Sequence, residues 1–182
     1  MTEVLRAFRA EYDVETSFGW SAGEPGFDFS APGLAALAPA VEIQVKTRAG
    51  SQWHGRFFGD SIGTSMVIDG PASGIVLVVA SGVGYLVPVE SPLEYRTIPF
   101  EPIRSVLVSG TLQMVCLVGF TGLVGLGGDG VVAWEARDLV SDGFTDALVA
   151  GSTLVVSGYV ASEARIVSMT LQLASGDVIE RD

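Results

Sequence analysis

From Val41 onward, hydrophobic and polar positions follow the two-residue period of β-strands. Residues 41–47 (VEIQVKT) alternate apolar and polar side chains, which predicts a half-buried strand. After a glycine turn the chain returns over residues 52–58. Two apolar runs on either side of another glycine turn, residues 75–80 and 85–89, predict a second strand pair.

The first forty residues have a different pattern. Thr2 is a suitable N-cap, and one face of the following segment is apolar at helical spacing, which predicts a helix over residues 2–12. The residues of that face are Leu5, Phe8 and Tyr12. Residues 12–39 are rich in Gly, Pro, Ser and Ala and predict a loop, with a short helix over residues 32–38.

Two stretches are almost free of charge. Residues 62–89 contain only Asp69, and residues 105–128 contain no charged side chain. The second stretch is long enough to cross a bilayer as a helix. Its many glycines and the absence of a basic cluster beside it favour buried strands instead.

The chain is similar to itself at offsets of about 37 to 46 residues, the range typical of propeller blades. Each unit contains strands separated by glycine turns, with an Asp-Gly or Ser-Gly turn before the last strand. The matching segments are residues 77–89 with 114–126, 103–115 with 145–156, and 128–135 with 174–180.

Residues 74–180 thereby resemble the blades of WD40-like and quinoprotein-like β-propellers. The resemblance rests on the turns at residues 128–130 and 175–177 and on Trp134, which closes one unit. The Trp-Asp dipeptide of WD40 blades is absent, and Trp134 has no counterpart in the last unit. The C-terminal hairpins also resemble those of small uncharacterised bacterial proteins.

These patterns predict an all-β fold. We expect an antiparallel meander of blade-like repeats that forms an open propeller-like stack or a sandwich, with one short N-terminal helix. We expect a single domain over residues 1–182, with the N-terminal helix and loop over residues 1–40 and the β core over residues 41–182. Sheet edges left uncovered by such a fold suggest a homodimer formed through them.

Composition excludes several classes of function. The chain has 21 acidic and 10 basic side chains, a net charge of −11, which opposes nucleic acid binding. A single cysteine excludes an intramolecular disulfide, and a single histidine removes most histidine-dependent catalysis and metal sites. We therefore expect neither enzymatic activity nor a cofactor or metal. The early acidic residues, with no long apolar run after them, predict a cytoplasmic protein without a secretory signal.

Two sequence motifs imitate known sites. Residues 58–61 (FGDS) resemble the first block of GDSL-type esterases, but no Asp-x-x-His motif exists and His54 lies upstream, so a turn is favoured. Residues 125–130 match the dinucleotide fingerprint, yet a strand follows instead of a helix, which favours a hairpin. Cys116 lies in an apolar run and is expected to be a buried hydrophobic side chain.

Acidic side chains concentrate between residues 129 and 146, with Arg137 as the only opposing charge. The residues of this acidic cluster are Asp129, Glu135, Asp138, Asp142 and Asp146. On loops at one end of a sheet they would form either a solubilising surface or a docking face for a basic protein partner.

The leading hypothesis for function is a non-enzymatic protein-binding module. The use of Ala, Gly, Val and Arg, with Lys46 the only lysine, suggests a high-GC bacterial source. In that setting a bacterial immunity or inhibitor protein that neutralises a basic toxin is the finer hypothesis. The alternatives are a carbohydrate- or small-ligand-binding β-protein and a structural component of an assembly. Aromatic platforms for such a ligand would come from Trp20, Trp53, Trp134 and Tyr85.

Overall fold

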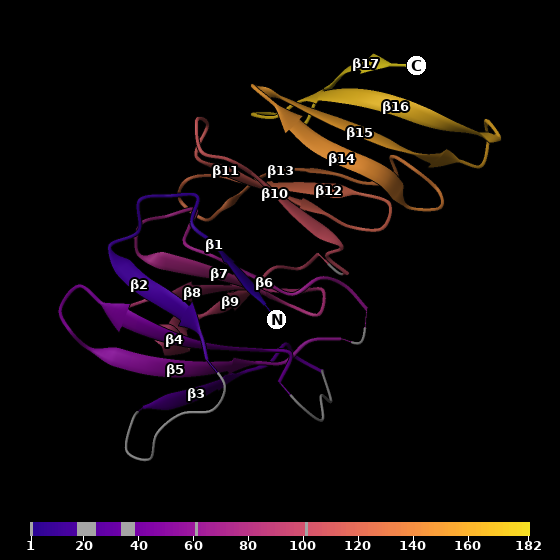
Figure 1. The fold of residues 1–182 in the computed structure, drawn as a ribbon. Helices are drawn as coiled ribbons and strands as arrows, with labels where there is room; N and C mark the ends of the chain where they lie inside the picture. Colours follow the sequence, from indigo (N-terminus) through magenta and orange to yellow (C-terminus); the bar gives the residue numbers. More distant parts are fainter. Residues whose placement is uncertain (1, 18–24, 34–38, 61, 101) are drawn as a thin grey trace. The chain divides into compact units, whose positions relative to one another are not determined.

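A computed structural model describes residues 2–17, 25–33, 39–60, 62–100 and 102–182 (Figure 1). The described residues form 17 strands and one short 3-10 helix, Pro92–Glu94, so the all-β prediction is confirmed. The chain divides into two compact units, residues 1–103 and residues 104–182. The single domain over residues 1–182 stays a prediction, and each unit is described by itself.

Unit 1 contains two sheets. Sheet A has the order β1 (Glu3–Leu5), β6 (Met66–Ile68), β7 (Ile75–Ala80), β8 (Val83–Pro88) and β9 (Arg96–Thr97). Sheet B has the order β2 (Tyr12–Thr16), β4 (Val41–Thr47), β5 (Gln52–Phe57) and β3 (Gly26–Phe29). Strands β6 to β9 form an antiparallel meander, whereas β1 joins β6, and β3 joins β5, in parallel.

Aromatic side chains fill the core shared by sheets A and B. The rings of Phe29 and Phe57 are stacked at 4.3 Å between centroids, and Tyr85 from sheet A meets Phe57 edge-on. The indole Nε1 of Trp53 in sheet B donates to the backbone carbonyl of Val89, one residue beyond β8, at 2.9 Å. This bond fixes one sheet of unit 1 against the other.

Unit 2 consists of two four-stranded antiparallel meanders. Sheet C contains β10 (Ser105–Ser109), β11 (Met114–Val118), β12 (Leu123–Leu126) and β13 (Val132–Ala136). Sheet D contains β14 (Phe144–Ala150), β15 (Thr153–Val160), β16 (Arg165–Gln172) and β17 (Val178–Arg181). The internal repeats align β7 and β8 with β11 and β12, β10 and β11 with β14 and β15, and β13 with β17, which are equivalent positions in their meanders. The predicted blade-like repeat is therefore present.

Trp134 joins the two sheets of unit 2. Its indole Nε1 donates to the backbone carbonyl of Leu173, one residue beyond β16, at 2.7 Å. The ring lies between two glycines: Gly125, its cross-strand neighbour in sheet C, and Gly176 in the β16–β17 turn of sheet D. A side chain at either glycine would collide with the indole.

The predicted N-terminal helix over residues 2–12 is wrong. Residues 3–5 form strand β1 beside β6, and the backbone amides of Ala7 and Phe8 donate to one carboxylate oxygen of Asp69 at 2.7 and 2.9 Å. Asp69 is only 4% exposed, so its carboxylate needs these donors. The pairing with β6 and the bonds to Asp69, both more than sixty residues away, therefore decide the conformation of this segment, although the local spacing of its apolar residues favours a helix. The short helix predicted over residues 32–38 falls mainly on residues 34–38, outside the described ranges.

The two charge-free stretches are strands, as predicted. Residues 105–128 fold into β10, β11 and β12 with their turns. Within the ranges given above, no helix is long and apolar enough to cross a membrane. Cys116 is buried, as its apolar run predicts, and so are Val115 and Val118 on β11 and Leu154 and Val156 on β15.

Cys116 provides a test of the interior of sheet C. Its side chain is 1% exposed, and burial raises the pKa of its thiol to about 12. We expect Cys116→Asp to lower the free energy of unfolding by several kcal/mol, because no partner compensates a carboxylate there. Val132→Asp, which adds the same charge at a 43% exposed position, should cost far less. Urea denaturation measures both, and equal stability of the two variants would place Cys116 at the surface.

Substitutions at Gly176 and Gly151 test how tightly the Trp134 indole is packed. Both adopt left-handed backbone, with φ of +74° and +64°. An added Cβ meets nothing within 4 Å at Gly151 but comes within 2.6 Å of the Trp134 ring at Gly176. Gly151→Ala should cost about 1–2 kcal/mol of stability from backbone strain alone. Gly176→Ala should cost about 1–3 kcal/mol more from overpacking, and equal unfolding midpoints would contradict the tight fit.

Candidate functional site

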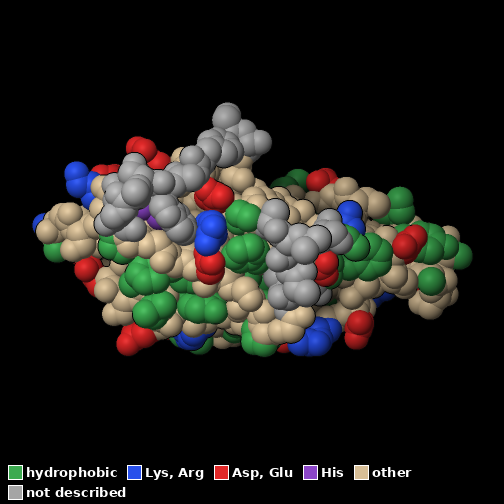
Figure 2. Space-filling view, turned by 90° about the horizontal axis from the view of Figure 1, so that it is seen from below, with side chains coloured by type: hydrophobic (Ala, Val, Ile, Leu, Met, Phe, Trp, Pro, Cys, Tyr) green, Lys and Arg blue, Asp and Glu red, His purple; other side chains and the backbone are tan. Residues whose placement is uncertain are grey.

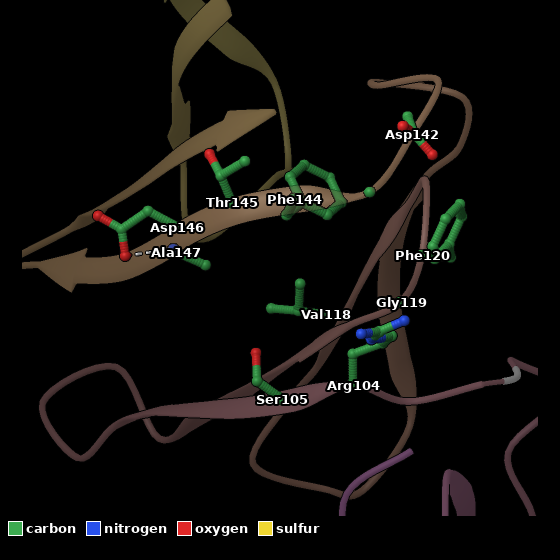
Figure 3. A pocket seen from close by; sticks show the side chains of 11 residues that line it. Arg104, Ser105, Val118, Gly119, Phe120, Asp142, Phe144, Thr145, Asp146 and Ala147 are labelled. Carbon is green, nitrogen blue, oxygen red and sulfur yellow. Dashed lines mark hydrogen bonds between the residues drawn. The ribbon is translucent and has the colours of Figure 1, made fainter. Parts of the chain in front are cut away.

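A groove of about 400 Å³ opens in unit 2 beside the first strands of sheets C and D (Figure 3). Strands β10 and β14 occupy an edge of their respective sheets, and they contact each other. The residues that line the groove are Arg104, Ser105, Val118, Gly119, Phe120, Asp142, Gly143, Phe144, Thr145, Asp146 and Ala147.

One wall of the groove comes from sheet C. The Arg104 amide donates to the Val118 carbonyl at 2.7 Å, which holds Arg104 beside the end of β11. Its guanidinium lies 5.7 Å from the centroid of the Phe120 ring, within the range of a cation–π interaction. Phe120 follows β11 in the hairpin turn and is 40% exposed.

The opposite wall comes from β14 and the segment before it. Gly143 has a φ of +82°, and a Cβ there would lie 3.4 Å from the Phe120 ring. A bulge interrupts the pairing of β14 with β15 between Phe144 and Asp146. A carboxylate oxygen of Asp146 accepts the Ala147 amide at 2.9 Å. The turn and the bulge together place Asp142 and Asp146 along this wall (Figure 3).

The charges of the groove favour a cationic ligand. Two exposed carboxylates, Asp142 and Asp146, and a single guanidinium, Arg104, line the groove. Carboxylates pair with an ammonium or guanidinium group, and an aromatic ring supports the apolar stem of such a side chain. The lining residues include no histidine, cysteine or lysine. Across the described ranges, no group of three His, Cys, Asp or Glu residues is placed to hold a metal ion.

The structure divides the acidic cluster predicted from the sequence. Asp142 and Asp146 line the groove, but Asp129, Glu135 and Asp138 do not. Asp129 lies in the β12–β13 turn, where its carboxylate accepts the amide of Val131. Glu135 on β13 forms an ion pair of 2.7 Å with Arg137. Asp138 follows β13, at the opposite edge of sheet C from β10. A contact of all five with one partner stays a prediction.

No sequence pattern marks Arg104 or Phe120 as site residues. Arg104 is separated from Asp142 by 38 positions, about one blade repeat, and only the packing of sheet C on sheet D brings them to one groove. The offset of the repeat could have indicated this proximity. Strands β10 and β14 are the equivalent first strands of their sheets, and they directly follow Arg104 and Gly143.

The aromatic platforms predicted for a carbohydrate are wrong where they can be checked. Trp53, Trp134 and Tyr85 are buried in the cores, where the indoles and the phenol hydroxyl all bond to backbone carbonyls. Trp20 lies outside the described residues. Phe120 is instead the exposed aromatic ring of the groove.

The dinucleotide-like motif forms the hairpin that the sequence favours. Residues 125–130 end β12 and turn into β13, with the Gly130 amide bonded to the Gly127 carbonyl, so they form a hairpin. His54 is buried in β5 with its Nε2 3.3 Å from Nε2 of Gln44. Ser61 of the esterase-like motif lies outside the described residues.

On the face seen in Figure 2, acidic and basic side chains drawn in colour are scattered among hydrophobic and other ones. On the sheet B face, for example, Arg56 binds both carboxylate oxygens of Asp28, at 2.6 and 2.7 Å.

No protein-family model matches the sequence, and no curated protein matches it either. Solved structures with a similar fold include the Neurospora crassa Pan2 WD40 domain, at 12% identity and a TM-score of 0.45 over 78% of this chain and 46% of that one. Saccharomyces cerevisiae Sqt1 matches at 12% identity and a TM-score of 0.45, over 79% and 43%. BamB from Moraxella catarrhalis matches at 12% identity and a TM-score of 0.39, over 90% and 66%. The chain thus spans less than half the length of the first two structures.

Proposed function

We propose that this chain is a non-enzymatic protein-binding module whose groove accepts a basic side chain of a protein partner. The observation that carries the proposal is that Asp142 and Asp146 line one groove, with Asp142 beside the exposed ring of Phe120 and Asp146 toward the other end (Figure 3). Binding residues gather on loops and strand ends held by a rigid scaffold, and the groove has this position in unit 2.

Electrostatics supports a basic partner. The net charge of −11 attracts a basic protein over long range, while the two carboxylates act at contact. Arg104 already lies over Phe120, so an incoming lysine or arginine finds its counter-charge at Asp142 and Asp146.

The finer proposal is an immunity or inhibitor protein of a bacterium that neutralises a basic toxin in the cytoplasm. Its support is the acidic charge, the small all-β fold and the composition typical of a high-GC bacterium. Capture of the partner from the native host, followed by mass spectrometry, tests this class directly.

Binding of a carbohydrate or another small polar ligand is the second candidate. The groove contains one exposed aromatic ring and two carboxylates, the combination that stacks and hydrogen-bonds a sugar. Calorimetric titration with a panel of monosaccharides and oligosaccharides separates the two candidates, since only this one expects heat of binding that is insensitive to salt.

Two double variants with the same change in charge test the groove. We expect Asp142→Asn with Asp146→Asn to slow association of a short fluorescent lysine-rich peptide by about two- to tenfold at low salt. Asp129→Asn with Asp138→Asn, outside the groove, should leave the rate nearly unchanged. Stopped-flow fluorescence at two ionic strengths measures both, and the rate of the groove variant should depend less on salt. Equal rates for the two variants would show that the acidic residues act only through net charge.

A further inference from the structure

Sheet D has an outer face whose two central strands carry no charge. The alternation of burial along β15 and β16 directs every second side chain away from sheet C. These outward residues are Thr153, Val155, Ser157, Tyr159, Ile166, Ser168, Thr170 and Gln172. The charged residues of the same face, Asp146 and Glu180, lie on the two edge strands.

Sheet B provides an internal comparison. Its face away from sheet A has charged residues on all four strands, namely Asp13, Glu15, Asp28, Glu42, Lys46 and Arg56. Both faces belong to one chain and lie on the outside of a two-sheet unit. Composition therefore does not explain the lack of charge on sheet D. A face exposed only to water gains nothing from excluding charge, whereas a face that contacts protein does.

The exposed groups of this face suit a dry contact. Ile166 is 58% exposed, and Tyr159, its cross-strand partner, and Leu148 on β14 are exposed as well. At the middle of the face, the hydroxyls of Ser157 and Ser168 bond to each other at 2.9 Å. Satisfied in this way, they can lose water at little cost.

We propose that two copies of this chain associate through the outer faces of sheet D. Two copies of a molecule with a net charge of −11 repel each other, so they can approach best along β15 and β16, where this face carries no charge. Packing this face on sheet B of another copy would bury charged groups such as Lys46 and Glu42 against apolar side chains. The same face on both copies avoids that cost and gives a closed twofold dimer.

The area of the outer face of sheet D limits the affinity of the dimer. Strands β14, β15 and β16 have seven or eight residues, and β17 has four. At ~3.3 Å per residue and ~4.8 Å between strands, they give a face of roughly 400 Å². Two such faces bury less than about 1,000 Å², the range of weak and transient contacts, so the dimer should be weak and reversible. This arrangement differs from the edge-to-edge homodimer predicted from the sequence. At the β14 edge, the Ala147 amide is already bonded by Asp146.

Ser168 is the position for the test, because it lies on a central strand near the middle of the face and thus close to the twofold axis. We expect the parent chain to show a concentration-dependent monomer–dimer equilibrium in sedimentation velocity. Ser168→Lys and Ser168→Asp alone should each weaken self-association at least about tenfold, because like charges meet at the axis. An equimolar mixture of the two should restore a dimer, since opposite charges then meet.

Glu15→Gln on sheet B is the control, because it changes the net charge by the same amount as Ser168→Lys and should leave the dimer intact. Circular dichroism and thermal melting establish that each variant is folded. A parent chain that stays monomeric at every concentration overturns the proposal. So does a dimer that persists unchanged in Ser168→Lys, or a mixture that fails to restore association, which would indicate a contact of sheet D with another surface. None of these results depends on the groove.

Discussion

A tryptophan indole bonded to the backbone of the facing sheet holds each unit together. Trp53 reaches the carbonyl of Val89 in unit 1, and Trp134 reaches that of Leu173 in unit 2. Each acceptor lies one residue beyond the third strand of its meander. A buried N–H that lost its acceptor would cost about 1–3 kcal/mol, so the bond selects one alignment of two otherwise apolar faces. Hydrophobic burial brings the sheets together, and the indole fixes their register.

The groove exists because this alignment is fixed. Its two walls belong to different sheets, and Arg104 and Asp142 line one groove only when β10 and β14 lie beside each other. The fixing indole is on β13, at the far edge of sheet C from β10. Trp134 therefore positions the groove residues without touching them. A rigid four-stranded sheet transmits the alignment from one edge to the other.

Strands were predictable where one face is buried, because apolar and polar residues then alternate along the sequence with a period of two. The strand at residues 41–47 was predicted with its observed bounds for this reason. The segment at residues 2–12 misled because its conformation depends on β6 and on the Asp69 carboxylate, which local spacing does not contain. The site was half predictable: Asp142 and Asp146 stand out as acidic residues, while Arg104 and Phe120 join them only through packing between sheets.

The indole of Trp134 between Gly125 and Gly176 also defines a shape. Removal of this side chain would leave a flat slot with glycine on both sides and the Leu173 carbonyl at one end. Such a slot matches free indole in size and in its one hydrogen bond. A Trp134→Gly chain would therefore be a scaffold whose folding depends on an added small molecule, with the concentration of indole setting the fraction of unit 2 that is assembled.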